Sequence, residues 1–89
     1  MFRERDIQHL DKSYFNIVLT GDFDVTVQSK NTGHFWYIHY RECHGEGDCV
    51  IFHKHRASHP YHQHGKAKNL RQAVRKIKGH DVFQMNGRR

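Results

Sequence analysis

The sequence predicts an α+β fold, a small antiparallel β-meander of three to four strands with one C-terminal amphipathic helix packed on one face. Apolar residues recur at every second position between residues 14 and 30, and an aromatic run follows at 34–40. That period is typical of β-strands. After residue 66 the apolar spacing changes to three and four residues, which is typical of a helix. A chain of 89 residues is long enough for a single domain.

The first part of the chain predicts an arm and two strands. Residues 1–12 alternate in charge without an apolar period, and we expect a flexible arm there. A strand follows in YFNIVLT, where Phe15, Ile17 and Leu19 share one face. The turn GDFD separates it from a second strand, VTVQSK, whose two valines point inward.

The middle of the chain predicts an aromatic strand. A tight turn at NTG, whose Gly33 supplies a positive φ, leads into HFWYIHY. Trp36 lies on one face of this strand, and Phe35 and Tyr37 lie on the other beside His39. Because one helix covers only one side of the sheet, we expect one set to be exposed. The exposed set would stack on unpaired bases, form a flat protein-binding patch or pack on a second copy in a homodimer, and all three alternatives stay open.

The last part predicts a strand, a helix and a short end segment. A polar loop, RECHGEGD, leads to the strand CVIFHKHR. The helix ends at Gly79, the usual residue after a helix, and residues 80–89 form a short strand or tail. A second helix face carries the cations Lys68, Arg71, Arg75 and Lys78. The apolar stripe consists of Ala67, Leu70, Ala73, Val74 and Ile77.

Charge is divided unevenly along the chain. Residues 1–48 carry five Lys or Arg against eight Asp or Glu, whereas residues 49–89 carry ten against Asp81 alone. The excess of positive charge in the second part favours a polyanionic partner.

The start of the predicted helix also favours a polyanionic partner. Cations about one helical turn apart can meet successive phosphates, and the positive end of the helix dipole already favours an anion. We therefore predict a small basic module that binds RNA or DNA, RNA first, through phosphates and shape. The predicted contact residues are Lys54, Arg56, Lys66, Lys68, Arg71, Arg75 and Lys78, with His34, Tyr61 and His62 near the edge.

The stretch GKAKNLRQAVRKI resembles the last helix of double-stranded-RNA-binding domains, which runs roughly Lys-Lys-x-Ala-Lys-Asn-x-x-Ala. The resemblance implies that the lysines clamp phosphates and that a three-stranded sheet precedes the helix. The matching residues are Lys66, Ala67, Lys68, Asn69 and Ala73.

A second motif belongs to the same comparison. Gly33-His34 is similar to the Gly-x-x-His loop of that family, whose histidine reaches a minor groove. The chain also resembles HicA-type toxins, small messenger-RNA nucleases with Gly-Ser-His on a strand, where this chain has TGH at 32–34. Both families open with a helix, whereas this chain predicts a strand there. The resemblance covers residues 33–79.

Histidines recur in HKH at 53–55 and HQH at 62–64, and Cys43 and Cys49 lie close by in the sequence. Together these residues supply enough ligands for zinc. The two cysteines are too far apart in sequence for a zinc knuckle, so the spacing favours neutral imidazoles on half-exposed strands. We predict no metal and no cofactor.

Two other functions stay open. A ribonuclease would use His34, His53 or His55 as acid and base, with Lys54 or Arg56 as the cation. The spacing places no carboxylate to orient a histidine, so we predict a binding protein rather than an enzyme and name no catalytic residue. The size and the aromatic sheet also fit a phage or mobile-element protein that modulates a host protein or nucleoprotein.

The apolar runs are too short for a membrane span, and Met1 is not followed by a signal-peptide pattern. We therefore expect a cytoplasmic protein with no membrane partner and with reduced cysteines. Its partner is a nucleic acid or, in the alternative, an acidic protein or nucleoprotein.

Overall fold

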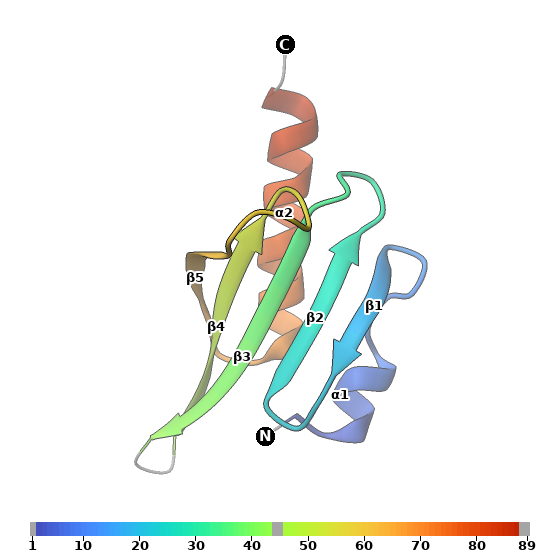
Figure 1. The fold of residues 1–89 in the computed structure, drawn as a ribbon. Helices are drawn as coiled ribbons and strands as arrows, with labels where there is room; N and C mark the ends of the chain where they lie inside the picture. Colours follow the sequence, from blue (N-terminus) through green and yellow to red (C-terminus); the bar gives the residue numbers. More distant parts are fainter. Residues whose placement is uncertain (1, 44–45, 88–89) are drawn as a thin grey trace.

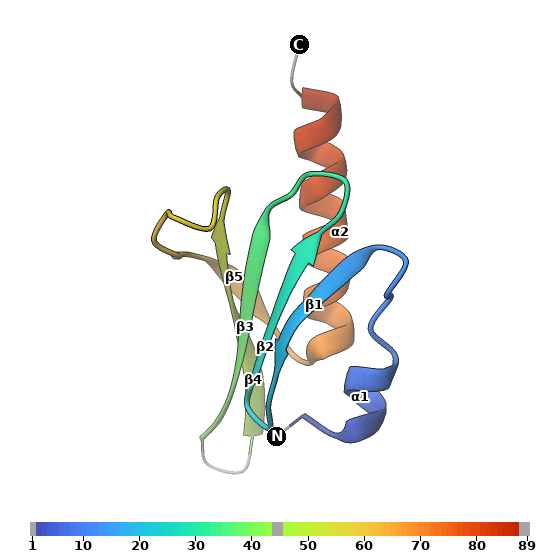
Figure 2. The same cartoon turned by 45° about the vertical axis from the view of Figure 1, so that its right-hand side comes forward.

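The computed structural model describes residues 2–43 and 46–87 and confirms the α+β class. A five-stranded antiparallel sheet forms one layer, and the helix α2 lies across one of its faces (Figure 1). Figure 2 shows the short helix α1 on the same side of the sheet as α2. The elements are α1 (Glu4–Gln8), β1 (Phe15–Thr20), β2 (Asp24–Ser29), β3 (Phe35–Cys43), β4 (Glu46–Lys54), β5 (His62–Ala67) and α2 (Leu70–Gly87).

The strands form a meander in which each strand pairs with the next, in the order β1-β2-β3-β4-β5. The predicted meander is confirmed, with one strand more than the sequence indicates. β5 reads HQHGKA and has no apolar alternation, so it leaves no period-two signal. It joins the sheet through its backbone, from Cys49 opposite Ala67 to His53 opposite His62.

The segment predicted as the polar loop RECHGEGD is mostly strand. β3 continues to Cys43 and β4 starts at Glu46. Arg41 and Asp48 lie opposite each other, and the Arg41 Nε donates to Asp48 Oδ1 over 2.6 Å. Cross-strand ion pairs of this kind stabilise a polar hairpin that lacks apolar alternation.

The core lies between α2 and the sheet. The predicted stripe is confirmed for the helix itself, because Leu70, Ala73 and Ile77 are buried. Ala67 is buried too, but it is the last residue of β5 rather than part of the helix. The two valines of β2 are fully buried, as predicted, together with Trp36 from β3. Trp36 belongs to the face of the aromatic strand that the helix covers. Phe35, Tyr37 and His39 lie on the open face of the sheet and are half-buried.

The helix is longer than predicted. Gly79 lies within α2, which continues to Gly87, so residues 80–87 are helical rather than a strand or tail. A glycine inside a helix costs stability, and Asp81, two residues after Gly79, makes inward hydrogen bonds that hold this part of the helix against the fold. The last turns extend beyond the sheet, where Val82 and Phe83 are exposed (Figure 1).

The N-terminal segment contains a short helix where the sequence indicates an arm. Phe2 and Leu10 are buried on either side of α1 and attach it to the core. The Phe2 backbone N–H also donates to the Asp22 carbonyl over 2.6 Å. Two isolated apolar residues eight positions apart form no period, which explains why the sequence pattern misses them.

Two local features set the register of the first strands. Gly33 has a φ of 76°, as the turn prediction requires. A bulge between Ile17 and Leu19 shifts the pairing of β1 with β2. Phe15 is therefore buried whereas Leu19 is 60% exposed, although strict alternation would place them on one face.

Candidate nucleic-acid interface

The start of α2 is fixed by a reciprocal cap. Asn69 Oδ1 accepts a hydrogen bond from the Gln72 backbone N–H over 2.8 Å. Gln72 Oε1 in turn accepts from the Lys68 backbone N–H over 2.7 Å. This cap ends β5 and begins the helix within three residues. It also fixes the direction of the backbone that carries Lys68 and Arg71.

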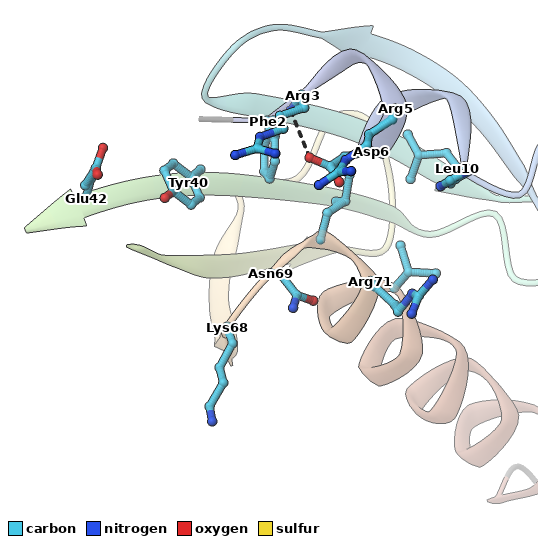
Figure 3. Close-up of a pocket in the computed structure, with 13 residues that line it drawn as sticks. Phe2, Arg3, Arg5, Asp6, Leu10, Tyr40, Glu42, Lys68, Asn69 and Arg71 are labelled. Atoms are coloured by element: carbon cyan, nitrogen blue, oxygen red, sulfur yellow. Dashed lines mark hydrogen bonds between the residues drawn. The ribbon is translucent and has the colours of Figure 1, made fainter. Parts of the chain in front are cut away.

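A groove of about 880 Å³ separates α1 from the start of α2 (Figure 3). Apolar groups, including Phe2, Leu10 and Val74, line it together with Tyr40. Four cationic side chains line it as well, and all four residues are exposed. These groove cations are Arg3, Arg5, Lys68 and Arg71.

The groove cations are not neutralised by neighbouring carboxylates. The ion pairs among residues 2–43 and 46–87 join His39 to Asp24, Arg41 to Asp48 and Lys78 to Asp11, and none of them includes a groove cation. Asp6 and Glu42 also line the groove, and Asp6 accepts from the Arg3 backbone N–H over 2.9 Å. Four cations against two carboxylates leave the groove positive.

The predicted basic face of the helix is divided. Lys68 lies in the link between β5 and α2 rather than on the helix, and it lines the groove together with Arg71. Arg75 is exposed one turn further along α2. Lys78 donates to Asp11 Oδ2 over 3.1 Å and lies 4.9 Å from the centre of the Tyr14 ring. Its charge is therefore used within the protein and does not continue the basic face.

A second group of predicted contacts lies at the opposite end of the sheet. Lys54 Nζ lies 4.3 Å from the centre of the Tyr61 ring and donates to the Ala57 carbonyl over 3.1 Å. Arg56 is exposed in the same β4–β5 loop, and His62 is exposed at the start of β5. The structure therefore separates these residues from Lys68 and Arg71.

The two remaining predicted contacts differ in their accessibility. Lys66 is exposed on β5, and its carbonyl accepts from Lys76 Nζ over 2.6 Å. His34 is only 6% exposed and lies on the face of the sheet that α2 covers. His34 is therefore an internal residue rather than a surface contact.

An aromatic group occupies the open face of the sheet. The Tyr37 ring centre lies 5.6 Å from that of Phe52 and 5.9 Å from that of Tyr61. The Tyr37 hydroxyl and His39 Nδ1 both bond to Asp24, and these hydrogen bonds lower the pKa of the Asp24 carboxyl. The hydrogen bond between the Tyr37 hydroxyl and Asp24 raises the pKa of Tyr37 to about 12.

Five histidines form a cluster between α2 and the sheet, four from the sheet side and His80 from α2 itself. The four are His34, His53, His55 and His64. His53 Nε2 lies 3.0 Å from His34 Nδ1, and the Trp36 ring stacks on the His53 ring with centres 3.9 Å apart. Burial, followed by the neighbouring histidines, lowers the pKa of His53 to about 3. Burial also lowers the pKa of His64. Both imidazoles are therefore neutral at pH 7.

Sequence spacing did not reveal this cluster. His34 and His53 come from strand ends 19 residues apart, and His80 lies in a segment predicted as non-helical. The alternation in HKH correctly places His53 and His55 near each other. The unrecognised β5 and the longer α2 bring in His64 and His80.

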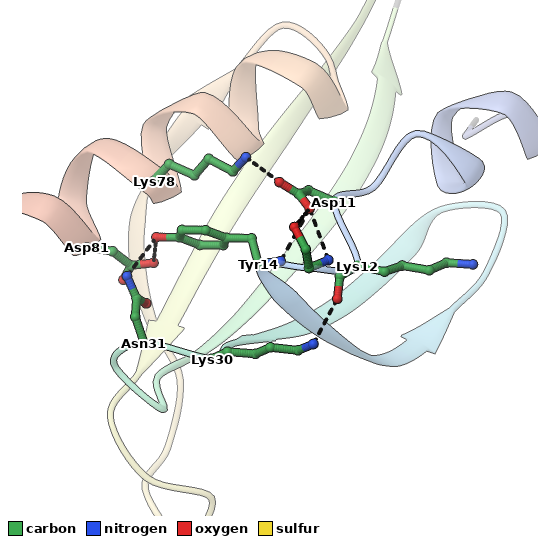
Figure 4. Close-up of polar contacts among 8 residues, drawn as sticks. Asp11, Lys12, Tyr14, Lys30, Asn31, Lys78 and Asp81 are labelled. Atoms are coloured by element: carbon green, nitrogen blue, oxygen red, sulfur yellow. Dashed lines mark hydrogen bonds and ion pairs between the residues drawn. The ribbon is translucent and has the colours of Figure 1, made fainter.

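Asp81 is a buried carboxylate that the sequence pattern does not reveal. It is fully buried, and its Oδ2 accepts from the Tyr14 hydroxyl over 2.7 Å (Figure 4). The same oxygen accepts from Ser29 Oγ over 2.6 Å. Asp81 follows Ile77 by four residues and so lies on the apolar face of the helix. That spacing is the signal that could have identified it, once the helix is extended past Gly79.

Cys49 is a fully buried free thiol. Burial raises the pKa of this thiol to about 11, so it is protonated and inert at neutral pH. The side chain of Cys43 lies outside the described residues.

No protein-family model, curated protein or solved structure matches the chain. Within the described residues, no helix is both long and apolar enough to cross a membrane.

Proposed function

We propose that this protein binds nucleic acid through its phosphate backbone, with RNA as the first candidate, in the groove between α1 and the start of α2. The observation that supports this most directly is the set of four groove cations, which form no ion pair with a described carboxylate. Each phosphate that a cation neutralises releases condensed counterions, which drives binding.

The position of the groove adds a second source of positive potential. Lys68 and Arg71 flank the first residues of an 18-residue helix, where the dipole favours anions. The cap by Asn69 uses the Gln72 amide for helix initiation, so we assign the contact to side chains. We expect the lysine and the arginines to bind phosphate oxygens directly.

The aromatic group on the open face is a separate surface. The helices α1 and α2 both lie on one side of the sheet (Figure 2), whereas these aromatic residues belong to the open face. A short strand in the groove would therefore not reach Tyr37 or Phe52. We assign phosphate contacts to the groove and expect binding that depends more on backbone shape than on base sequence.

Variants of the groove test this proposal. Labelled duplex RNA, duplex DNA and single-stranded RNA are titrated with the protein, and binding is measured by fluorescence anisotropy. The double variant Lys68→Gln with Arg71→Gln is expected to raise Kd at least about tenfold, a loss of about 1.4 kcal/mol. The double variant Arg3→Gln with Arg5→Gln is expected to do the same.

A matched control separates local contacts from net charge. Lys30→Gln with Arg56→Gln removes the same charge at the opposite end of the sheet, where both side chains are exposed. We expect its Kd to stay within about threefold of the wild-type value, since distant exposed charges are screened. Equal losses in all three double variants would contradict a binding site in the groove.

The same samples test the alternatives predicted from sequence. A ribonuclease would shorten the labelled RNA during incubation, whereas the proposed binding leaves it intact. A protein that modulates a host protein would show no saturable binding to any of the three nucleic acids.

A further inference from the structure

Three of the clustered histidines come from three different elements. His53 belongs to β4, His64 to β5 and His80 to α2. Each offers a ring nitrogen, and the three nitrogens lie within 4.8 Å of one another. The rings are inclined to one another at 69° to 78°, with centres 4.6 to 5.8 Å apart. Inclined rings can each direct one nitrogen towards a common centre.

We propose that His53, His64 and His80 bind one divalent transition-metal ion, zinc first among the candidates. Three imidazoles form a ligand set that suits zinc, copper or nickel and disfavours magnesium and calcium. Zinc–nitrogen bonds of about 2.1 Å place tetrahedral ligand nitrogens about 3.4 Å apart. Small side-chain rotations of the exposed His64 and the half-buried His80 close the remaining distance.

A second layer of contacts prepares these ligands. His34 is buried, and its Nδ1 accepts a hydrogen bond when His53 Nε2 donates over 3.0 Å. That tautomer leaves the lone pair of His53 on Nδ1 for the metal. Gln84 Nε2 lies 3.5 Å from His80 Nε2, at the outer limit of a hydrogen bond, so a metal can replace this weak contact.

One positive charge near the cluster opposes a bound cation. Lys76 is the charged side chain that acts on His64. Its Nζ is held 2.6 Å from the Lys66 carbonyl oxygen. The bound ion would be balanced by a hydroxide or by an anion at its fourth position.

A second triad of histidines has a less suitable arrangement. His34, His53 and His55 also bring their nitrogens within 4.8 Å. The His34 and His55 rings, however, are stacked within 8° of parallel and 4.2 Å apart. The nitrogen lone pairs of two stacked, parallel rings lie in parallel planes and therefore do not converge on one ion. We therefore assign the ion to the triad that includes His80.

The expected consequence is that the metal attaches α2 to the end of the sheet. A ligand that binds only the folded chain raises Tm. At a zinc concentration about 100 times Kd, we expect Tm to rise by about 10 °C or more.

The test uses the full chain without a histidine tag, stripped with chelator and titrated with zinc chloride at pH 7.5. Calorimetry is expected to give one ion per chain, and differential scanning to give the rise in Tm. His64→Gln and His80→Gln are each expected to weaken zinc binding at least about tenfold. His62→Gln changes an exposed histidine on the same strand outside both triads and is expected to keep wild-type affinity.

Circular dichroism in chelator establishes that each variant folds, and cobalt supplies a spectroscopic check. Four-coordinate cobalt(II) has an intense visible absorption that is expected in the wild type and absent in His80→Gln. Absence of saturable zinc binding would overturn the proposal. So would a loss of binding in His55→Gln with wild-type binding in His80→Gln, because that result places the ion in the other triad.

Discussion

Asp81 shows how one residue ties the helix to the rest of the fold. Its carboxylate accepts hydrogen bonds from Tyr14, Ser29 and Thr32, and Trp36 Nε1 donates to Ser29 Oγ over 3.2 Å. A buried carboxylate requires such partners, because its desolvation is otherwise costly. The network therefore anchors α2 to the segment before β1 and to the β2–β3 turn.

Removing the Asp81 charge tests this role. In the wild type, the Tyr14 and Ser29 hydroxyls donate to Asp81 Oδ2. In Asp81→Asn, an amide NH₂ can occupy the place of that oxygen, and the buried hydroxyls then lose their acceptor. We expect a loss of about 1–3 kcal/mol in the free energy of unfolding, measured by urea denaturation. Asp22→Asn, at an exposed position, is the control and should change it by less than about 0.5 kcal/mol. Equal effects of the two substitutions would contradict the network.

Asp11 gives a pH prediction at the same scale. The hydrogen bond from the Ser13 side chain, followed by the one from Lys78, lowers the pKa of Asp11 from 3.8 to about 2. Because the folded-state pKa is lower than the unfolded-state pKa, the ionised group stabilises the fold above about pH 4. That contribution is lost as the pH falls towards 2.

A comparison with Asp11→Asn isolates the effect. The Tm of the wild type should exceed that of the variant at pH 5, and the difference should shrink as the pH falls to about 2. Circular dichroism at several pH values measures both. A difference in Tm that stays constant over this range would rule out the ionised Asp11 as its source.

At the scale of elements, the start of α2 depends on its cap. Asn69→Ala removes the acceptor for the Gln72 amide and is expected to lower the free energy of unfolding by about 1 kcal/mol. Asn69→Asp keeps an acceptor oxygen and adds a favourable charge at the helix start, so it should retain wild-type stability. Chemical denaturation of the three proteins decides the matter. A loss in Asn69→Asp as large as in Asn69→Ala would show that the cap is not responsible.

The elements also show which part of the fold a sequence pattern can predict. Apolar alternation in β2 and the helical stripe that includes Leu70 and Ile77 identify the meander and the covering helix, and both are confirmed. β5 was missed because its backbone pairs without an apolar period. Gly79 predicts a helix end because glycine commonly follows a helix. The helix continues through contacts of Asp81 with residues far away in the sequence, which a local pattern does not reveal.

At the scale of the whole molecule, the division of charge along the sequence does not match its distribution in space. Arg3 and Arg5 come from the acidic part of the chain, yet they line the same groove as Lys68 and Arg71 (Figure 3). Lys78 comes from the basic part and is paired with Asp11.

The candidate site was therefore only half predictable. Helical spacing identifies Lys68 and Arg71, but the short α1 and the two buried residues that flank it bring the other cations into place. The same holds for the histidine cluster, because His64 and His80 join it only through β5 and the part of α2 beyond Gly79.

The salt dependence of binding to duplex RNA tests the central claim most directly. Binding is measured by anisotropy from about 50 to about 200 mM KCl. Four phosphate contacts predict a slope of about −3.6 in a plot of log K against log salt concentration. Lys68→Gln with Arg71→Gln should reduce the steepness by about 2. A slope near zero in the wild type, or an unchanged slope in the double variant, would contradict phosphate binding in the groove.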